Sequence, residues 1–227
     1  MMMDEPARQP NLIILEDQDS EVILELFPAV WQAAEKLVSA NLKDRHAGLD
    51  DLLTTEAARV SPLIAYLLVT RLGEPDLGMR TRIVEALANV MRRDAKGQYA
   101  SEAVRAQIIA AMVELAEPGL FAMIEVGAQN ETMLGHIAKL INFTPSAGNY
   151  LKDLAADRKQ RVENRRLAIY FIGRIGFADA YSELVRIRNR IESRQFGQKS
   201  MPFAPTGGEN EELLLPEINK VLATLGA

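Results

Sequence analysis

Apolar residues recur every three or four positions along almost the whole chain. This spacing is typical of helices that bury one face, and it differs from the strict alternation that marks a half-exposed strand. It predicts an all-α protein of about eleven helices with no convincing strand. Most of the connections are short, so consecutive helices are expected to lie antiparallel to each other.

Capping residues and helix breakers place several of the helix ends. A helix is predicted over residues 42–54. Ser61 followed by Pro62 is a strong signal for the start of a helix. The serine side-chain oxygen can accept a hydrogen bond from a backbone N–H of the first turn. Proline is favoured at the first helical position, because the N–H that it lacks would have no partner inside the helix. Ser101 starts another helix in the same way, and the pair Pro118–Gly119 is expected to end it.

One connection is longer than the others. Residues 196–210 are rich in glycine, proline and polar residues, and a connection of this length is usually functional or mobile. The sequence therefore predicts four parts along the chain. They are an N-terminal tail with one or more capping helices (1–41), helical repeats (42–195), a mobile loop (196–210) and a C-terminal capping helix (211–227).

Three helical segments repeat one another. They begin at Val104, Thr132 and Asn164, align at offsets of 28 and 32 residues, and are expected to face inward at their fifth, eighth, ninth and twelfth positions. An arginine recurs in the same frame in four segments: Arg45, Arg80, Arg105 and Arg165. Arg80 and Arg105 are only 25 residues apart, so the register of first and second helices stays open in that stretch.

The third of these segments, NRRLAIYFIGRIGFADAYSELVRI, resembles the short HEAT repeat of the phycobilisome-lyase type. In that repeat an arginine-led helix ends in a Leu/Ile-Gly-x-Ile-Gly turn, which a pair of small residues and a second helix follow. Gly173 and Gly176 match the two glycines, and Ala178 and Ala180 match the small pair. The likeness is close over about 25 residues and loose over roughly residues 42–195.

This resemblance implies a right-handed α–α superhelix, a HEAT-like solenoid in which helix pairs stack because one pair cannot bury both of its apolar faces alone. Gly173 would permit a close approach between helices, and Gly176 would adopt the left-handed turn that ends the first helix. The resemblance also implies that Arg165 belongs to a structural ladder, with an acidic residue such as Asp157 as its partner. Such repeats occur in many unrelated proteins, so the fold alone does not name a function.

Composition excludes several kinds of chemistry. The 227 residues include no cysteine, which rules out disulfides, thiolate catalysis and cysteine-bound metals. The longest apolar run, Leu63–Val69, is far shorter than the roughly 20 residues that span a bilayer. The first residues lack the basic and apolar regions of a signal peptide. We therefore expect a cytoplasmic protein that does not contact a membrane.

Catalytic and metal-binding groups are also sparse in the sequence. The two histidines, His46 and His136, lie 90 residues apart, and neither has a partner at metal-ligand spacing. No phosphate-binding glycine motif and no serine nucleophile motif occurs. Two groups of neighbouring carboxylates, near residue 50 and near residue 211, fit exposed helix ends better than acid–base catalysis. The sequence therefore predicts no enzyme activity, cofactor or metal.

Charge is distributed unevenly along the chain. The net charge is −5, but residues 158–199 contain 11 basic and 4 acidic residues, a local excess of +7. Arg186, Arg190 and Arg194 recur every four residues and so share one helix face. Three more basic residues lie nearby in the sequence: Arg158, Lys159 and Arg161. These six form a candidate surface for a protein partner or a polyanion, and the alternative is a solvated face whose arginines pair with residues such as Glu183.

Three functions are consistent with these features. A non-catalytic scaffold or adaptor would bind a protein partner through its repeat surface. A nucleic-acid-binding protein would use the basic helix face, and HEAT-like alkylpurine DNA glycosylases resemble this chain in architecture. A bilin lyase is indicated only by the repeat subtype. We expect the scaffold. The sequence does not identify its partner or its oligomeric state, although the uneven charge would permit head-to-tail association.

Overall fold

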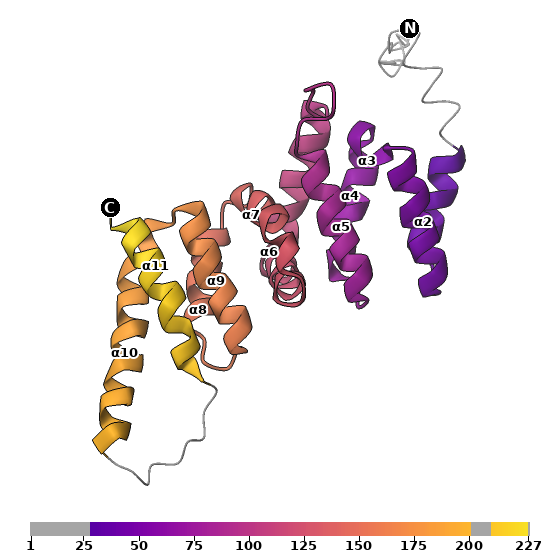
Figure 1. Cartoon of the computed structure of the whole chain (residues 1–227). Coiled ribbons are helices and arrows are strands. Elements are labelled where there is room, and N and C mark those ends of the chain that lie inside the picture. Colours follow the sequence, from indigo (N-terminus) through magenta and orange to yellow (C-terminus); the bar gives the residue numbers. More distant parts are fainter. Residues whose placement is uncertain (1–27, 201–209, 227) are drawn as a thin grey trace, which may run out of the picture. The chain divides into compact units, whose positions relative to one another are not determined.

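The computed structural model describes residues 28–200 and 210–226, and Figure 1 shows their helices coloured in chain order. Within these residues every regular element is a helix, which confirms the all-α prediction. Most of the expected N-terminal tail, and residues 201–209 of the expected loop, lie outside the described residues.

The chain divides into two compact units, Met1–Thr55 and Glu56–Ala227. The described part of the first unit contains a helical stretch at residues 28–37 and helix α2 (Leu42–Thr54). α2 has the bounds that the sequence predicts. The division after α2 separates it from the later helices, whereas the sequence placed residues 42–195 in one set of repeats.

Two local contacts organise the first unit. The Asn41 side-chain oxygen accepts a hydrogen bond from the Lys43 amide at 3.0 Å and so caps α2. At Gly48, an added Cβ atom would lie 2.5 Å from the carbonyl oxygen of Ala33. The two described helices of this unit therefore touch at a point where only glycine fits, and this explains why α2 groups with the helix before it.

The second unit consists of helices joined mostly by short turns. In its described residues these elements are α3 (Ala57–Val60), α4 (Pro62–Thr70), the 3-10 helix η1 (Arg71–Gly73), α5 (Leu77–Val90), α6 (Glu102–Gln129), η2 (Glu131–Met133), α7 (Leu134–Asn142), α8 (Ala147–Ala156), α9 (Val162–Ile175), η3 (Ala178–Ala180), α10 (Tyr181–Ser200), η4 (Glu211–Leu214) and α11 (Leu215–Leu225). Figure 1 labels the α-helices of this series.

The helix ends that depend on capping residues are confirmed. The Ser61 hydroxyl accepts a hydrogen bond from the Ile64 amide at 3.4 Å, at the start of α4. The Ser101 hydroxyl accepts one from the Val104 amide at 3.2 Å, at the start of α6. Gly176 ends α9 in the left-handed conformation, with φ 68° and ψ 35°. Local side-chain and backbone chemistry is sufficient to fix these three points.

The helix break expected at Pro118 lies two residues earlier, at Ala116, and Pro118 begins a helical segment instead of ending one. α6 is two helical segments joined at Ala116, whose φ of 50° and ψ of −135° are not helical. Pro118 therefore lies in the first turn of the second segment, where proline is favoured, and does not end the first. Only glycine enters this backbone region readily, so Ala116 is strained.

The loop expected over residues 196–210 begins later than predicted. α10 continues to Ser200, so the first part of that stretch is helical. A single glycine, Gly197, costs a helix interior only about 1 kcal/mol and does not end it. At the other end of the stretch, η4 precedes α11, and Pro216 lies in the first turn of α11 as the sequence predicts.

Packing in the second unit joins helices that are two apart in the series as well as consecutive ones. α4 packs on α6, α5 on α7, and α9 on α11, while α8 packs on α9. Figure 1 shows α11 beside α10 and α9 at the C-terminal end. A Cβ atom at Gly173 would lie 2.7 Å from a methyl carbon of Val221, which confirms the predicted close approach at this glycine and identifies α11 as the partner helix. Ala180, the small residue of η3, is fully buried.

The repeat frame is correct in one of its copies and shifted in another. In the segment that begins at Asn164, the expected inward residues Phe171 and Ile172 are buried. In the segment that begins at Thr132, the expected inward residue Lys139 is exposed, and Ile137 is buried instead. This copy starts with the 3-10 turn η2, whose tighter winding moves the helix register by one position.

α6 is the one helix of the described residues that is long and apolar enough to cross a membrane by length and composition. The core helices of soluble proteins pass the same test. The non-helical residue Ala116 also divides α6 into two shorter segments. The sequence expectation of no membrane contact and a cytoplasmic location therefore stays a prediction.

Candidate functional site

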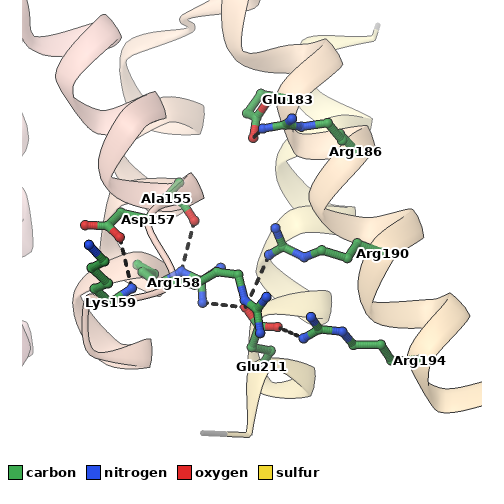
Figure 2. Close-up of polar contacts among 10 residues, drawn as sticks. Ala155, Asp157, Arg158, Lys159, Glu183, Arg186, Arg190, Arg194 and Glu211 are labelled. Carbon is green, nitrogen blue, oxygen red and sulfur yellow. Dashed lines mark hydrogen bonds and ion pairs between the residues drawn. The ribbon is translucent and has the colours of Figure 1, made fainter. Parts of the chain in front are cut away.

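Four arginines from three parts of the second unit meet at one carboxylate (Figure 2). Arg158 lies between α8 and α9, Arg165 on α9, and Arg190 and Arg194 on α10, while Glu211 is the first residue of η4. Nitrogen–oxygen distances to Glu211 are 3.8 Å from Arg158, 2.7 Å from Arg165, 3.2 Å from Arg190 and 2.7 Å from Arg194. We call these five residues the arginine cluster.

Arg165 is the buried member of the cluster. Its side chain is 1% exposed, its Nε donates to the carbonyl oxygen of Ala155 at 3.0 Å, and one terminal nitrogen donates to Glu211. The direct partner of Arg165 is Glu211, whereas Asp157, the partner expected from the HEAT resemblance, interacts with Arg165 only through its charge. Asp157 instead accepts hydrogen bonds from the Lys159 amide at 2.9 Å and from the Gln160 side chain at 3.3 Å, because its short side chain closes its own turn.

The cluster has more positive charge than its one carboxylate neutralises. Burial would raise the pKa of Glu211, but the hydrogen bond from Arg165 and the charges of Arg165, Arg190 and Arg158 outweigh it and hold this pKa below its ordinary value. Burial lowers the pKa of Arg190, and although Glu211 raises it, the neighbouring arginines lower it further. The four arginines around Glu211 leave a local charge of +3. The arginines are close enough for their positive charges to repel one another, as the lowered pKa of Arg190 indicates.

Three of the six basic residues singled out from the sequence do not reach this cluster. Arg186 donates to Glu183 at 2.7 Å, and this hydrogen bond raises the pKa of Arg186. Arg161 lies 3.8 Å from Glu163. Among the described residues, no ion pair joins Lys159 or Arg161 to Glu211. The pairing with Glu183 that the solvated-face alternative expects is found for Arg186 alone. Arg158, Arg190 and Arg194 converge instead on Glu211, a residue that the prediction did not connect with them.

Sequence reasoning missed Glu211 as the centre of the cluster. It noted this residue only as one of several neighbouring carboxylates near the C-terminal helix. Glu211 is 46 residues from Arg165 and 17 from Arg194, so no local pattern links them. The available signal was Gly173: its lack of a side chain admits α11, and η4 with Glu211 leads directly into that helix.

The other repeat arginines have different partners. Arg80 donates to Glu125 at 2.7 Å, on the second segment of α6. Arg105 lies over the ring of Tyr99, with 5.0 Å between the guanidinium carbon and the ring centroid, and Arg93 lies over the same ring at the same distance. The arginine frame of the sequence therefore does not correspond to one repeated contact.

A second charged site lies between α6, α8 and the turn that follows α8. It is a cleft of about 540 Å³ lined by Glu117, Pro118, Phe121, Tyr150, Asp153, Leu154, Asp157 and Gln160. Three of these residues are carboxylates, two are aromatic, and none is basic. We call it the acidic cleft.

Electrostatics inside the acidic cleft follow from this lining. Burial raises the pKa of Tyr150 to about 12, with a further contribution from the charges of Glu117 and Glu125. The amide of Lys159 donates to Asp157 and lowers the pKa of that carboxyl despite some burial, so Asp157 stays ionised at neutral pH. Within the described residues no group of three or more His, Cys, Asp and Glu residues has the spacing to hold a metal ion. The cleft is therefore a negatively charged, partly aromatic depression.

Comparisons with known proteins identify no relative. No protein-family model matches the chain, no curated protein is significantly similar to it, and no solved structure matches its fold. The resemblance of residues 164–187 to a HEAT repeat therefore stays a prediction from the sequence.

Proposed function

We propose that this chain is a non-catalytic scaffold or adaptor with HEAT-like repeats, which binds a basic segment of a protein partner in its acidic cleft. The observation that carries this proposal is the lining of the cleft. Three carboxylates and two aromatic rings surround a depression of about 540 Å³. Carboxylates pair with lysine and arginine side chains, and aromatic faces attract the same cations.

The packing order of the second unit supports the repeat part of the proposal. Contacts such as α4 with α6, α5 with α7 and α9 with α11 join alternate helices of the series. In a solenoid each helix pair stacks on the next pair in this way and leaves extended surfaces for partners. The right-handed superhelix remains part of the proposal, as does the HEAT subtype.

Position within the molecule also favours the cleft as a binding site. It follows the strained residue Ala116, which turns the second segment of α6 and places Glu117 and Phe121 opposite α8. Strained backbone persists where the surrounding structure holds it, and it often lies beside functional sites. The bilin-lyase alternative has no comparable observation in its favour.

A charge-matched pair of variants tests the proposal. Glu117→Gln/Asp153→Asn removes two charges from the cleft, and Glu102→Gln/Glu114→Gln removes two exposed charges from the first segment of α6, outside it. Binding of a fluorescent arginine-rich peptide would be followed by anisotropy. We expect the cleft variant to bind about tenfold more weakly than the wild type and the control to bind within about twofold of it. Equal binding by the two variants would remove the cleft as the site.

The same two variants identify a natural partner. In a pull-down from native cytosol, with and without nuclease, a direct protein partner would survive nuclease, persist with the control variant and disappear with the cleft variant. A partner set that collapses with nuclease would favour the second candidate, nucleic-acid binding by the basic face of α10. The specific observation in favour of this second candidate is the excess of basic residues along the chain, 11 basic against 4 acidic residues over residues 158–199.

A further inference from the structure

Glu211 neutralises only part of the positive charge of the arginine cluster. Both oxygens of Glu211 already have partners: Oε1 accepts from Arg165 and Arg190, and Oε2 accepts from Arg194. Arg158 reaches Oε1 only as an ion pair at 3.8 Å. The charge of Asp157 also acts on Arg165, but among the described residues the ion pairs of these four arginines are with Glu211 alone. The cluster therefore has an excess of positive charge, which a second anion would reduce.

Donors for such an anion remain at the surface of the cluster. Each guanidinium group has five N–H donors in a planar fork, and each of Arg158 and Arg194 uses few of them on Glu211. Their side chains are 54% and 44% exposed, and that of Arg190 is 28% exposed. Arg165 is buried beneath them, and its second terminal nitrogen has no hydrogen-bond partner. The buried arginine fixes the base of the cluster, and the exposed ones face solvent.

The arrangement of these charges selects among anions. Three of the arginines lie within 3.8 Å of the same oxygen, Glu211 Oε1, so the positive groups surround a point. A nucleic-acid backbone is a row of single charges and is matched by a stripe of cations. A phosphomonoester concentrates a charge of about −1.5 to −2 on three terminal oxygens, which arginine forks bind bidentately.

We propose that the arginine cluster binds a phosphomonoester group on a side chain of a protein partner, next to Glu211 and on the exposed side formed by Arg158, Arg190 and Arg194. A dianion there reduces the local charge from +3 to about +1. The half-exposed arginines open the site to the surface, which suits a group presented by another protein. Glu211 holds the guanidinium groups together before the phosphate arrives.

A matched pair of double variants tests this site. Arg158→Gln/Arg194→Gln removes two exposed members of the cluster. Arg161→Gln/Arg186→Gln makes the same change of charge at two exposed arginines that pair locally with Glu163 and Glu183. The probes are a neutral peptide with one phosphoserine, its unphosphorylated twin, inorganic phosphate and a single-stranded oligonucleotide. Titrations of the ¹⁵N-labelled full chain would follow backbone amide and arginine Nε–H resonances.

We expect the phosphopeptide to shift the Nε–H resonances of Arg190 and Arg194 and to bind at least about tenfold more weakly to the cluster variant. The control variant should bind within about twofold of the wild type. The unphosphorylated peptide should not bind. Inorganic phosphate should shift the same resonances with lower affinity, because it lacks the contacts of the peptide. The spectra themselves report whether each variant is folded.

Three outcomes would overturn the proposal. One is equal binding of the phosphopeptide by the two double variants. Another is inorganic phosphate binding as tightly as the peptide, which would assign the site to a small anion. The third is oligonucleotide binding that is lost to the same extent in both variants, which would assign the whole basic face to nucleic acid. The cleft variant Glu117→Gln/Asp153→Asn should leave phosphopeptide binding unchanged, so failure of the cleft and failure of the cluster are distinguishable.

Discussion

The acidic cleft and the arginine cluster are neighbours along the chain and are built in opposite ways. Asp157 lines the cleft, and the next residue, Arg158, belongs to the cluster. The lining of the cleft includes three carboxylates and no basic residue. In the cluster four cations gather around one carboxylate, with a fully buried arginine at the base. The like charges of the cleft line an open depression. Those of the cluster pack around a counter-ion, Glu211, which forms ion pairs with arginines of α9 and α10.

This difference teaches that the number of charges in a segment does not indicate how they act. The sequence shows a basic segment from residue 158 to residue 199, and the obvious interpretation is a solvated or polyanion-binding face. In the structure one glutamate from beyond that segment, Glu211, converts part of the face into a structural junction between α9, α10 and η4. The cluster should therefore contribute to stability, and the cleft should contribute mainly to binding.

The largest change in the free energy of unfolding is expected when the buried arginine of the cluster, Arg165, is replaced. Arg165→Ala should lower the free energy of unfolding by about 3 kcal/mol or more, because it leaves the Ala155 carbonyl without its donor, opens a void and weakens the hold on Glu211. Arg158→Ala, at the exposed rim of the same cluster, should cost at most about 1 kcal/mol. Urea unfolding followed by circular dichroism compares the two, and similar losses would contradict the distinction between base and rim.

The central carboxylate should have a smaller effect that depends on pH. Glu211→Gln should lower the free energy of unfolding by about 2 kcal/mol at pH 7, because charge-assisted hydrogen bonds to the arginines are lost. The pKa of Glu211 is lowered in the folded state, so its contribution is present above the unfolded pKa of about 4.3 and is lost as pH falls through the folded value.

The stability gap between wild type and Glu211→Gln should therefore narrow below about pH 4. Unfolding curves at pH 7, 5, 4 and 3 measure this gap. Glu212→Gln, at the exposed neighbouring residue, is the control and should leave stability nearly unchanged at every pH. A gap that stays constant down to pH 3 would show that the charge of Glu211 does not hold the cluster together.

The helix contact that brings Glu211 to the arginines can be weakened without changing any charge. Gly173→Ala would place a methyl group 2.7 Å from Val221 and should lower the free energy of unfolding by about 1–2 kcal/mol. Gly135→Ala, on α7, meets nothing within 4 Å and should raise it by up to about 1 kcal/mol through helix propensity. Thermal unfolding of the two variants would show opposite shifts. A stable Gly173→Ala protein would contradict the close packing of α9 on α11.

Next to the cleft, replacing the strained residue Ala116 should increase the stability of the protein. Ala116→Gly should raise the free energy of unfolding by about 1 kcal/mol, because glycine adopts its backbone angles without steric cost. Ala110→Gly, at an exposed position inside the first segment of α6, should lower it by about 1 kcal/mol. Denaturant unfolding would show whether the free energy of unfolding rises in the first variant and falls in the second. Destabilisation by both substitutions would indicate an unbroken helix at residue 116.

The smallest effect concerns the electrostatic field of the cleft. Tyr150 should titrate at about pH 12, two units above an ordinary tyrosine. Glu117→Gln should lower the pKa of Tyr150, since removing a nearby negative charge makes the tyrosinate easier to form. Tyrosinate absorbance at alkaline pH measures this, with Tyr150→Phe to isolate its signal among the five tyrosines. Glu114→Gln is the control. Equal titration curves in the two glutamate variants would contradict a field set by Glu117.

Helices and their caps were largely predictable, because they depend on residues close together in the chain. Ser61, Ser101 and Gly176 each act within one turn, and α2 begins and ends where the sequence places it. The error at Pro118 has a local origin as well. A proline can end one helix or begin another, and the strained angles of Ala116 are not visible in the residue type.

The candidate sites were less predictable, because their members come from distant parts of the chain. The helical spacing of Arg190 and Arg194 correctly places them on one face. It cannot show that Arg165 approaches from another helix or that Glu211 completes the group. The acidic cleft had no sequence signal, since Glu117 and Asp153 are 36 residues apart and belong to different helices.

The sequence by itself determines the helical character of this protein, the ends of several helices and the glycine that admits α11. Each of these depends on interactions within a few residues, which periodicity and capping chemistry encode directly. Only the tertiary structure decides that Asp157 and Arg158 serve two different sites, and that Glu211 closes one of them. These outcomes depend on which side chains are brought together when helices pack. The separation of two residues in the sequence does not indicate how far apart they lie in the folded protein.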